Sequence, residues 1–304
     1  MSDQLIIVDW GTTAFRAWLI EAESGTILAE IPDGLGMRAL AREEFAAYAN
    51  KQLAPWRNTP VPVYMAGMVG APQGWQWAPQ PPLPLGLSDI AQQIVPVTEL
   101  DNAFIIPGVS QKGAPQDADV IRGEEVQIWG ALELTGRQSA TLCLPGTHSK
   151  WAQVEAGTFT HFATAMTGEV YEVMLEHSIL GLMANKKAPF NLDAFVKGLE
   201  QAEHAGGLLH HLFTARSRVL AKEIAEPETA SYLSGLLIGS ELTGLIPSSC
   251  SQQDEILLVC AEQLAKPYEI ALSRAGYLCR HITSRDATLC GVRAVARMHN
   301  PALQ

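Results

Sequence analysis

Residues 5–13 read LIIVDWGTT, an apolar run that ends in an aspartate and then a glycine followed by two threonines. The apolar run predicts a buried strand, and Gly11 predicts a tight turn after it. Further strands are expected at Trp18–Ile20 and, after a turn at Gly25, at Thr26–Ala29. A Gly-Thr turn between strands presents backbone N–H groups and hydroxyls to an anion, so this stretch predicts a phosphate-binding hairpin.

The same pattern returns in the middle of the chain, where residues 141–149 read TLCLPGTHS. A strand at Trp151–Val154, a turn at Gly157 and a strand at Thr158–Phe162 are expected to follow. Two such turns that face each other can hold one polyphosphate from both sides. The copies differ because Asp9 of the first has Leu144 as its counterpart, so only the first half can hold a metal ion.

Composition favours a globular protein that binds small molecules. The chain has 304 residues, is 47% hydrophobic and carries a net charge of −11, which suggests about two domains and gives no positive field for nucleic acid or an anionic membrane. No apolar run approaches the roughly 18 residues of a membrane span, and Met1–Gln4 lead directly into a strand, so we expect a cytoplasmic location. The five cysteines form no CxxC pair, which argues against disulfides or structural zinc.

The stretch from Pro60 to Gly86 predicts a short strand at Val61–Ala66 and then a stiff loop rich in glycine and proline. In one interpretation this loop is a wall of a pocket for a small polar substrate, with Gln73 donating hydrogen bonds and Trp75 or Trp77 closing the side. In the other it is a surface loop whose tryptophans cover the core. The sequence leaves both interpretations open.

Two adjacent carboxylates, Glu124 and Glu125, follow a predicted strand at Ala103–Ile106 and begin a predicted amphipathic helix that runs to Leu134. Carboxylates in a first helical turn are often simply favourable helix starters. The alternative is that one of them accepts the proton of a substrate hydroxyl as that oxygen attacks phosphorus. Because this helix leads into the second Gly-Thr turn, its start is expected near a phosphate.

The rest of the chain reads as helices with two late strands. Apolar periodicity predicts helices at 41–53, 167–183, 192–203, 208–221, 230–245, 267–275 and 286–298, and a buried strand at Ile256–Cys260. A flat base is expected beside Cys260–Gln263, under the segment Ser234–Glu241, because Gly235 and Gly239 permit close approach.

Five strings in this order resemble the 2-dehydro-3-deoxygalactonokinase family: VDWGTTAFRAWL, MAGMVGAPQGW, IRGEEVQIWGAL, LPGTHSKW and SGLLIGSEL. The family belongs to the actin, sugar-kinase and heat-shock ATPase superfamily. The resemblance implies an α/β fold of two ribonuclease-H-like domains that flank a nucleotide cleft. Residues 1–137 would form the substrate and metal lobe, with 286–304 packing back onto it, and 138–285 the nucleotide-binding lobe.

The resemblance also implies ATP-dependent phosphorylation of 2-dehydro-3-deoxy-D-galactonate at its 6-hydroxyl, a step of D-galactonate degradation that uses Mg²⁺. Asp9 would hold the hydrated metal, and Glu124 would be the base, with Glu125 and Asp119 as open alternatives. The implied ATP contacts are Gly11, Thr12, Thr13, Arg16, Gly146, Thr147, His148, Ser149, Lys150, Gly239 and Glu262. The implied substrate contacts are Trp10, Met68, Gly70, Gln73, Trp75 and Arg122.

Two other functions stay open at this stage. One is a kinase of the same fold that acts on another keto-deoxy sugar acid, such as 2-keto-3-deoxygluconate, or on a sugar. The other is a non-catalytic nucleotide-binding module, which would be expected to lack a substrate base and to carry a partner-binding domain. The sequence does not choose between a monomer and a homodimer.

Overall fold

A computed structural model describes residues 4–112, 118–185, 187–247 and 249–303. The chain divides into two compact units, and each contains segments that are distant in sequence. Unit 1 comprises Met1–Ala140, Ala152–Phe162 and Ile282–Gln304, and unit 2 comprises Thr141–Trp151 and Ala163–His281.

The first sheet carries the N-terminal hairpin and has the strand order β3-β2-β1-β4-β7-β6. Its strands are β1 (Gln4–Trp10), β2 (Phe15–Glu21), β3 (Ile27–Ile31), β4 (Val63–Ala66), β6 (Val95–Pro96) and β7 (Ala103–Ile105). Strand β1 runs antiparallel to β2, with Asp9 opposite Arg16, and parallel to β4, with Asp9 beside Ala66. Asp9 therefore lies near the carboxyl ends of two parallel central strands, where α/β sheets commonly bind ligands.

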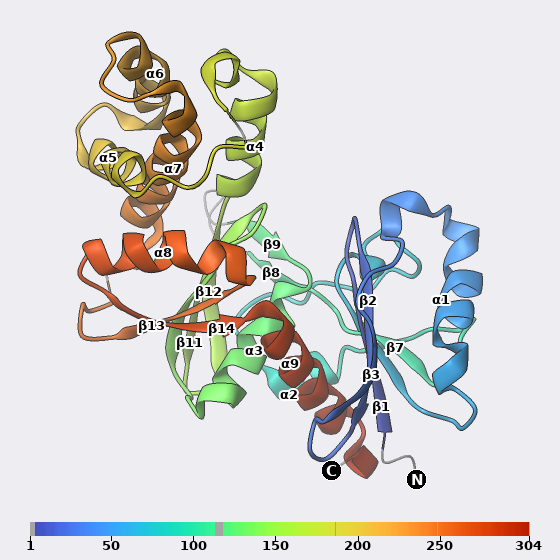
Figure 1. Ribbon diagram of the computed structural model, residues 1–304. Coiled ribbons are helices and arrows are strands. Elements are labelled where there is room, and N and C mark those ends of the chain that lie inside the picture. The colour runs from blue at the N-terminus through green and yellow to red at the C-terminus, as the bar shows by residue number, and fades with distance from the viewer. Residues whose placement is uncertain (1–3, 113–117, 186, 248, 304) are drawn as a thin grey trace. The chain divides into compact units, whose positions relative to one another are not determined.

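Helices cover both faces of this sheet because β1 is apolar on both sides (Figure 1). Ile6 and Val8 share a core cluster with Phe45 of α1 (Phe45–Leu53). On the other face α9 (Ser284–His299) contacts β1 and β4, and the Tyr64 hydroxyl lies 2.7 Å from Nδ1 of His299. An apolar run with no alternation is the expected sequence of a strand buried on both faces.

Helix α3 (Glu124–Thr135) is held against α9 by two glycines. A Cβ on Gly130 would lie 1.9 Å from the carbonyl oxygen of Ala287, and one on Gly291 would lie 1.8 Å from that of Val126. The two backbones are therefore in direct contact, which fixes the position of the first turn of α3 within unit 1.

The second sheet has the strand order β14-β13-β10-β11-β12-β5, and a two-stranded sheet pairs β8 with β9. The bounds are β5 (Leu85–Gly86), β8 (Val109–Gln111), β9 (Asp119–Ile121), β10 (Ala140–Leu144), β11 (Ser149–Glu155), β12 (Thr158–Ala165), β13 (Glu255–Cys260) and β14 (Leu278–Thr283). Within unit 2, β10 and β13 are parallel, with Leu142 beside Leu257.

Unit 2 carries most of the helices, and α7 (Thr229–Leu245) is in contact with four of them (Figure 1). Its neighbours are α4 (Thr167–His177), α5 (Leu192–Glu203), α6 (Gly207–Leu220) and α8 (Glu262–Arg274). The remaining short elements are α2 (Leu87–Ala91) and the 3-10 helices η1 (Met37–Ala39), η2 (Arg42–Glu44), η3 (Ala54–Trp56), η4 (Met68–Gly70), η6 (Gly181–Met183), η7 (Glu226–Glu228) and η8 (Pro301–Leu303). In the described part of the chain no helix combines the length and the apolarity of a membrane span.

Three predicted helices have different bounds in the structure. The helix predicted at 41–53 begins with η2, so its regular part starts only at Phe45. The helix predicted at 167–183 ends at His177, and a Cβ on Gly181 would lie 1.9 Å from the carbonyl oxygen of Leu175, because the chain folds back onto α4. Helix α8 begins at Glu262, so the prediction that it starts at Pro267 was wrong. Pro267 lies inside the helix, where its missing N–H costs one helical hydrogen bond.

Candidate active site

The first Gly-Thr turn closes directly after β1. The N–H of Gly11 donates to the carbonyl of Ala14 at 2.9 Å, which completes the turn between β1 and β2. Gly36 packs behind it, since a Cβ there would lie 2.2 Å from the carbonyl carbon of Thr13. Thr12 is half-buried and Thr13 exposed, so their hydroxyls and backbone can be reached by a ligand.

Asp9 is the acidic residue of this turn, and its surroundings favour a cation. Its Oδ2 accepts a hydrogen bond from Arg16 at 3.3 Å, and its side chain is 29% exposed. Burial raises the pKa of Asp9, the Arg16 guanidinium opposes this shift, and the negative charge of Glu124 adds to it. Glu124 is thus close enough to repel Asp9, and a cation would relieve that repulsion.

Two glycines with positive φ bring the start of α3 near Asp9. Gly67 has φ 100°, and a Cβ there would lie 2.9 Å from the carbonyl oxygen of Trp10 and 3.5 Å from Oδ1 of Asp9. Gly123 has φ 106°, and a Cβ there would lie 3.3 Å from Cα of Gly67. A side chain at either position would be strained and would push these segments apart.

The adjacent carboxylates of α3 lie in different environments. Glu125 is fully buried and accepts the N–H of Gly123 at 2.6 Å. Burial, followed by the charge of Glu124, raises its pKa from an ordinary value of 4.5 to about 8. Glu124 is only half-buried and accepts the N–H of Arg122 at 3.2 Å. At neutral pH Glu125 therefore keeps its proton and cannot accept another, whereas the Glu124 side chain is accessible to a ligand.

Arg122 places a guanidinium in the same neighbourhood. Its Nη2 donates to the carbonyl of Ala78 at 2.7 Å, whereas Nη1 is buried and has no hydrogen-bond partner among the described residues. Nη1 packs directly against Gly70, because a Cβ at position 70 would lie 2.6 Å from that atom. A buried donor without an acceptor is costly, so Nη1 suits an anionic ligand group.

Of the three tryptophans predicted to contact substrate, Trp10 and Trp75 are core residues instead, whereas Trp77 is 58% exposed. Trp10 is 0% exposed and donates its Nε1–H to the carbonyl of Leu35 at 3.1 Å. Trp75 is 4% exposed and donates to Glu99 at 2.8 Å, so the interpretation in which its ring closes a pocket is wrong. Met68 packs against the same core cluster, and Gln73 is exposed. The loop follows the second interpretation at Trp75, because an indole buries more apolar area in the core than at a rim.

Asp119, an alternative base, begins β9 in the two-stranded sheet. Its Oδ1 accepts the N–H of its neighbour Val120 at 2.7 Å, a local contact that is typical of a turn carboxylate. The charge of Glu124 is among the causes that raise the pKa of Asp9, and the charge of Asp119 is not.

The second Gly-Thr turn lies in unit 2 against the first turn of α4. A Cβ on Gly168 would lie 2.4 Å from the carbonyl oxygen of Gly146, and the N–H of Glu169 donates to the carbonyl of Thr147 at 2.9 Å. Nε2 of His148 and Oε2 of Glu169 are also in hydrogen-bond contact. The turn thus adjoins a helix N-terminus, whose N–H groups and dipole favour an anion.

Two predicted phosphate donors of this turn have buried side chains. Ser149 is 0% exposed and its hydroxyl donates to Glu241 at 2.7 Å. Lys150 is 4% exposed, and its Nζ donates to the carbonyl of His148 at 2.9 Å. These side chains support the turn from behind, which corrects their predicted contact with phosphate, and they leave Gly146, Thr147 and His148 at the surface.

A cavity of about 260 Å³ adjoins the turn within unit 2. Its walls are largely apolar, with a few hydroxyls, which is typical of a site for a flat base. It is lined by Pro145, Gly146, Thr167, Gly168, Tyr171, Phe190, Ala230, Ser231, Ser234, Leu237, Ile238, Leu264, Pro267 and Tyr268.

Two predicted ATP contacts do not line this cavity. Gly239 faces α5, since a Cβ there would lie 2.8 Å from Cβ of Ala202, and Glu262 is exposed in the first turn of α8. Gly235 and Gly239 pack α7 against α5, which the sequence alone could not distinguish from ligand contact. Thr167, Tyr171 and Tyr268 line the cavity but were not predicted, and only the Thr-Gly pair at 167–168 offered a signal, as a helix start.

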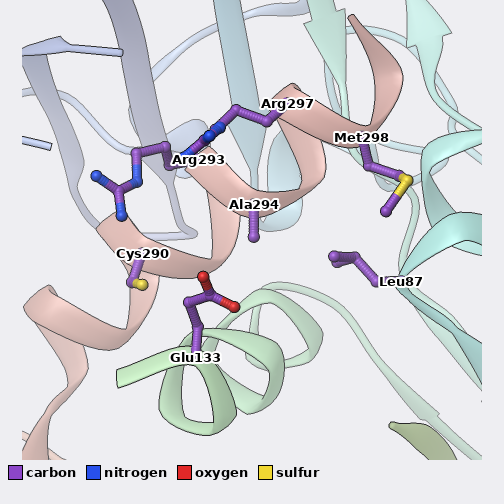
Figure 2. Close-up of a pocket in the computed structure, with 7 residues that line it drawn as sticks. All are labelled: Leu87, Glu133, Cys290, Arg293, Ala294, Arg297 and Met298. Carbon is purple, nitrogen blue, oxygen red and sulfur yellow. The ribbon is translucent and has the colours of Figure 1, made fainter. Parts of the chain in front are cut away.

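A second cavity, of about 220 Å³, lies along α9 in unit 1. Figure 2 shows Glu133 of α3 directed toward α9, which contributes Cys290, Arg293, Ala294, Arg297 and Met298, with Leu87 at the side. Arg293 donates to the carbonyl of Glu23 at 3.2 Å. None of the predicted site residues lines this cavity, so we do not assign the active site to it.

A magnesium ion is compatible with the site in unit 1. Among the described residues no three histidine, cysteine or acidic side chains form a metal-binding group. Mg²⁺ commonly uses one or two carboxylates and takes its other ligands from water and phosphate. The partly buried carboxylate of Asp9, which feels the charge of Glu124, meets that requirement.

Comparison with known proteins points to one family. The family model for 2-keto-3-deoxy-galactonokinase matches residues 9–295. The chain is 33% identical to a 2-dehydro-3-deoxygalactonokinase of Escherichia coli (strain K12) over 97% of its length and 98% of the relative's. A solved structure from Sinorhizobium meliloti, described with the same kinase name, superposes with a TM-score of 0.91 at 33% identity and covers 98% of this chain and 99% of the other.

A more distant structure supports the fold alone. Component A of (R)-2-hydroxyglutaryl-CoA dehydratase from Acidaminococcus fermentans superposes with a TM-score of 0.53 at 12% identity, over 99% of this chain and 100% of the other. The fold extends to relatives whose sequences have diverged almost completely.

Proposed function

Because the chain belongs to the 2-keto-3-deoxy-galactonokinase family, we propose that it transfers the γ-phosphoryl group of ATP to the 6-hydroxyl of 2-dehydro-3-deoxy-D-galactonate. The family membership confirms the kinase class and the family that the sequence motifs predicted, and the structural relatives confirm the actin-like, two-domain α/β fold. The assignment of metal and sugar acid to unit 1, and of nucleotide to unit 2, is part of the proposal.

The pairing of Asp9 with Glu124 carries the proposal. Transfer needs a carboxylate that accepts the hydroxyl proton while the substrate oxygen bonds to phosphorus and the bond from phosphorus to the ADP oxygen breaks. Glu124 is accessible and lies at a helix start, whereas Glu125 holds its own proton. These differences support Glu124 as the base.

Asp9 would hold Mg²⁺ through its partly exposed carboxylate. An ion held there would supply positive charge to the transferring phosphoryl group. Thr12 and Thr13 then offer donors from the same turn, and Arg16 orients the Asp9 carboxylate through their hydrogen bond.

Arg122 is the residue that we assign to the carboxylate of the sugar acid. Its Nη1 is buried and has no hydrogen-bond partner among the described residues, and the neighbouring Glu125 is neutral at pH 7 because burial raises the Glu125 pKa to about 8. The guanidinium charge is therefore not cancelled by Glu125. A substrate carboxylate would supply a charged acceptor to Nη1, whereas a neutral sugar could supply only an uncharged oxygen.

The cavity of unit 2 would take the adenine. Its apolar walls from α7 and α8 suit a flat base, and the adjoining turn at Gly146–His148 and the first turn of α4 suit the phosphates. A homodimer and a cytoplasmic location stay predictions.

An assay of ATP consumption tests the substrate. We expect the galactonate-derived keto-deoxy acid to have the highest kcat/KM in a panel with the gluconate-derived acid and neutral hexoses. Better turnover of a hexose would contradict the proposal. In the same assay Arg122→Gln should raise KM for the acid about tenfold or more with little change in KM for ATP, whereas Arg42→Gln on an exposed surface should change neither.

A further inference from the structure

Glu241 is the only charged residue in the sequence of α7, and it lies in the interior of unit 2 at 5% exposure. Leu242, next to it, belongs to the apolar core cluster that also holds Trp151 and Tyr268. A carboxylate is costly in such surroundings unless hydrogen bonds replace its water. An apolar residue would fill the same place in α7 without that cost, so the charge calls for an explanation.

Both oxygens of Glu241 are fully used. Oε1 accepts from the Ser149 hydroxyl at 2.7 Å and from Trp151 Nε1 at 2.9 Å. Oε2 accepts from the Tyr268 hydroxyl at 2.8 Å and from the Thr167 hydroxyl. Two bonds to each oxygen match the acceptor capacity of a carboxylate, so no further donor is needed.

The four donors fall into two pairs with different positions. Ser149 and Trp151 belong to β11, and Ser149 ends the Gly146–Ser149 turn. Thr167 begins α4 and Tyr268 comes from α8, and both line the cavity beside that turn. One carboxylate therefore ties the turn to two walls of the cavity.

The bonds also fix what Thr167 and Tyr268 can offer to a ligand. Each hydroxyl has a single proton and donates it to Oε2. Toward the cavity these oxygens can then only accept hydrogen bonds. Burial and the charge of Glu241 raise the pKa of Tyr268 well above its ordinary value, so its hydroxyl keeps the proton that it donates.

We propose that Glu241 is a positioning residue for nucleotide binding: it holds the second Gly-Thr turn against α4 and presents Thr167 and Tyr268 as acceptors for a donor group of the nucleotide. The inference rests on the proposed function, because it takes the cavity of unit 2 to be the nucleotide site. The matching donors on ATP are the exocyclic amine of adenine and the ribose hydroxyls.

Glu241→Gln is the central variant because it keeps the shape of the side chain. Trp151 can only donate, so the amide oxygen must face it, and the amide N–H₂ then faces Thr167 and Tyr268. Their hydroxyls must turn their protons away, which reverses what they offer to the cavity. We expect KM for ATP to rise about tenfold while KM for the sugar acid stays unchanged.

Variants of the donors separate positioning from general support of the fold. Thr167→Val removes the hydroxyl at nearly constant volume and should raise KM for ATP about tenfold. Thr167→Ser keeps the hydroxyl, so its KM for ATP should equal that of the wild type. Tyr232→Phe removes a buried hydroxyl of α7 that bonds to Thr214 and not to Glu241, and it should lower the melting temperature without a change in KM for ATP. If Glu241→Gln lowered only the melting temperature, Glu241 would be a structural residue and the inference would be wrong.

Two ATP analogues distinguish the possible donor groups. One lacks the adenine amine and the other lacks both ribose hydroxyls, and the wild type should bind one of them about tenfold more weakly than ATP. Thr167→Val should lose that preference. Equal binding of both analogues and ATP by the wild type would overturn the acceptor role.

Direct binding of ATP separates this inference from the proposed site. The bulky substitution Ala230→Phe in the cavity wall should abolish ATP binding to the folded protein. If Ala230→Phe binds ATP normally, the cavity is not the nucleotide site and the proposed function fails at that point. If Ala230→Phe abolishes binding and Glu241→Gln leaves KM for ATP unchanged, only the inference fails.

Discussion

Replacing Glu125 with glutamine should stabilise the protein at neutral pH. Glu125 is 0% exposed, and its Oε1 is buried without a hydrogen-bond partner in the described residues. Burial raises its pKa from 4.5 to about 8, so at pH 7 the folded chain keeps a proton that the unfolded chain releases. Glutamine has nearly the same shape and never ionises, and its amide oxygen can still accept the N–H of Gly123.

The size of the effect follows from the two pKa values of Glu125, 4.5 and about 8. Between pH 4.5 and 7, ionisation of Glu125 lowers the free energy of the unfolded state by about 1.4 kcal/mol per pH unit. The free energy of unfolding of the wild type therefore falls by about 3 kcal/mol over this range, whereas that of the variant does not. Because the pKa of Glu125 is raised in the folded state, the stability that its protonated form contributes is fully present below pH 4.5 and is lost as the pH rises to about 8.

Urea unfolding of both proteins from pH 4.5 to 8.5 measures the difference. The gain of Glu125→Gln should approach zero at the lowest pH, reach about 3 kcal/mol at pH 7 and level off above pH 8. Glu133→Gln is the matched control, because Glu133 is an exposed glutamate of the same helix and should give no such pH dependence. A gain that is absent at pH 7, or equal at every pH, would refute the assigned burial and protonation of Glu125.

Three further predictions concern single residues. Asp9→Asn should abolish turnover at the Mg²⁺ concentrations that saturate the wild type, with an unchanged melting temperature. A magnesium titration measures this, and near-normal activity at those concentrations would contradict the role of Asp9. Glu124→Gln should lower kcat by about a hundredfold or more with little change in KM, and a normal kcat would move the base elsewhere. Gly235→Ala should lower the free energy of unfolding by about 2 kcal/mol or more, because its Cβ would lie 1.9 Å from the Phe195 carbonyl oxygen, whereas Gly244→Ala, with nothing within 4 Å, should be neutral or slightly stabilising.

The phosphate turns were visible in the sequence because their signals are local. An apolar strand followed by Gly-Thr specifies strand, turn and donors within a few neighbouring residues, and both turns occur where the motifs predicted. The helix start at Glu124 was likewise expected, since carboxylates and apolar spacing mark it directly. The helix at Leu192–Glu203 has the predicted bounds, because Asn191 caps it by accepting the N–H of Ala194.

Residues whose role depends on distant neighbours were assigned less well. Ser149 and Lys150 follow a phosphate motif, yet their side chains point to partners behind the turn. Gly239 was expected beside a base but faces α5, and the ring of Trp75 lies in the core. A glycine or tryptophan carries no information in the sequence about which surface it will meet.

By itself the sequence determined the family, the kinase class, the two Gly-Thr turns and the four acidic candidates Asp9, Asp119, Glu124 and Glu125, because these depend on residue type and short spacing. Only the tertiary structure decided between the two adjacent glutamates. Gly67 and Gly123 bring the start of α3 near Asp9, and burial then keeps a proton on Glu125 while Glu124 stays accessible. Desolvation is a property of the assembled surroundings, so two neighbours in one helical turn acquire opposite chemistry that their order in the chain does not reveal.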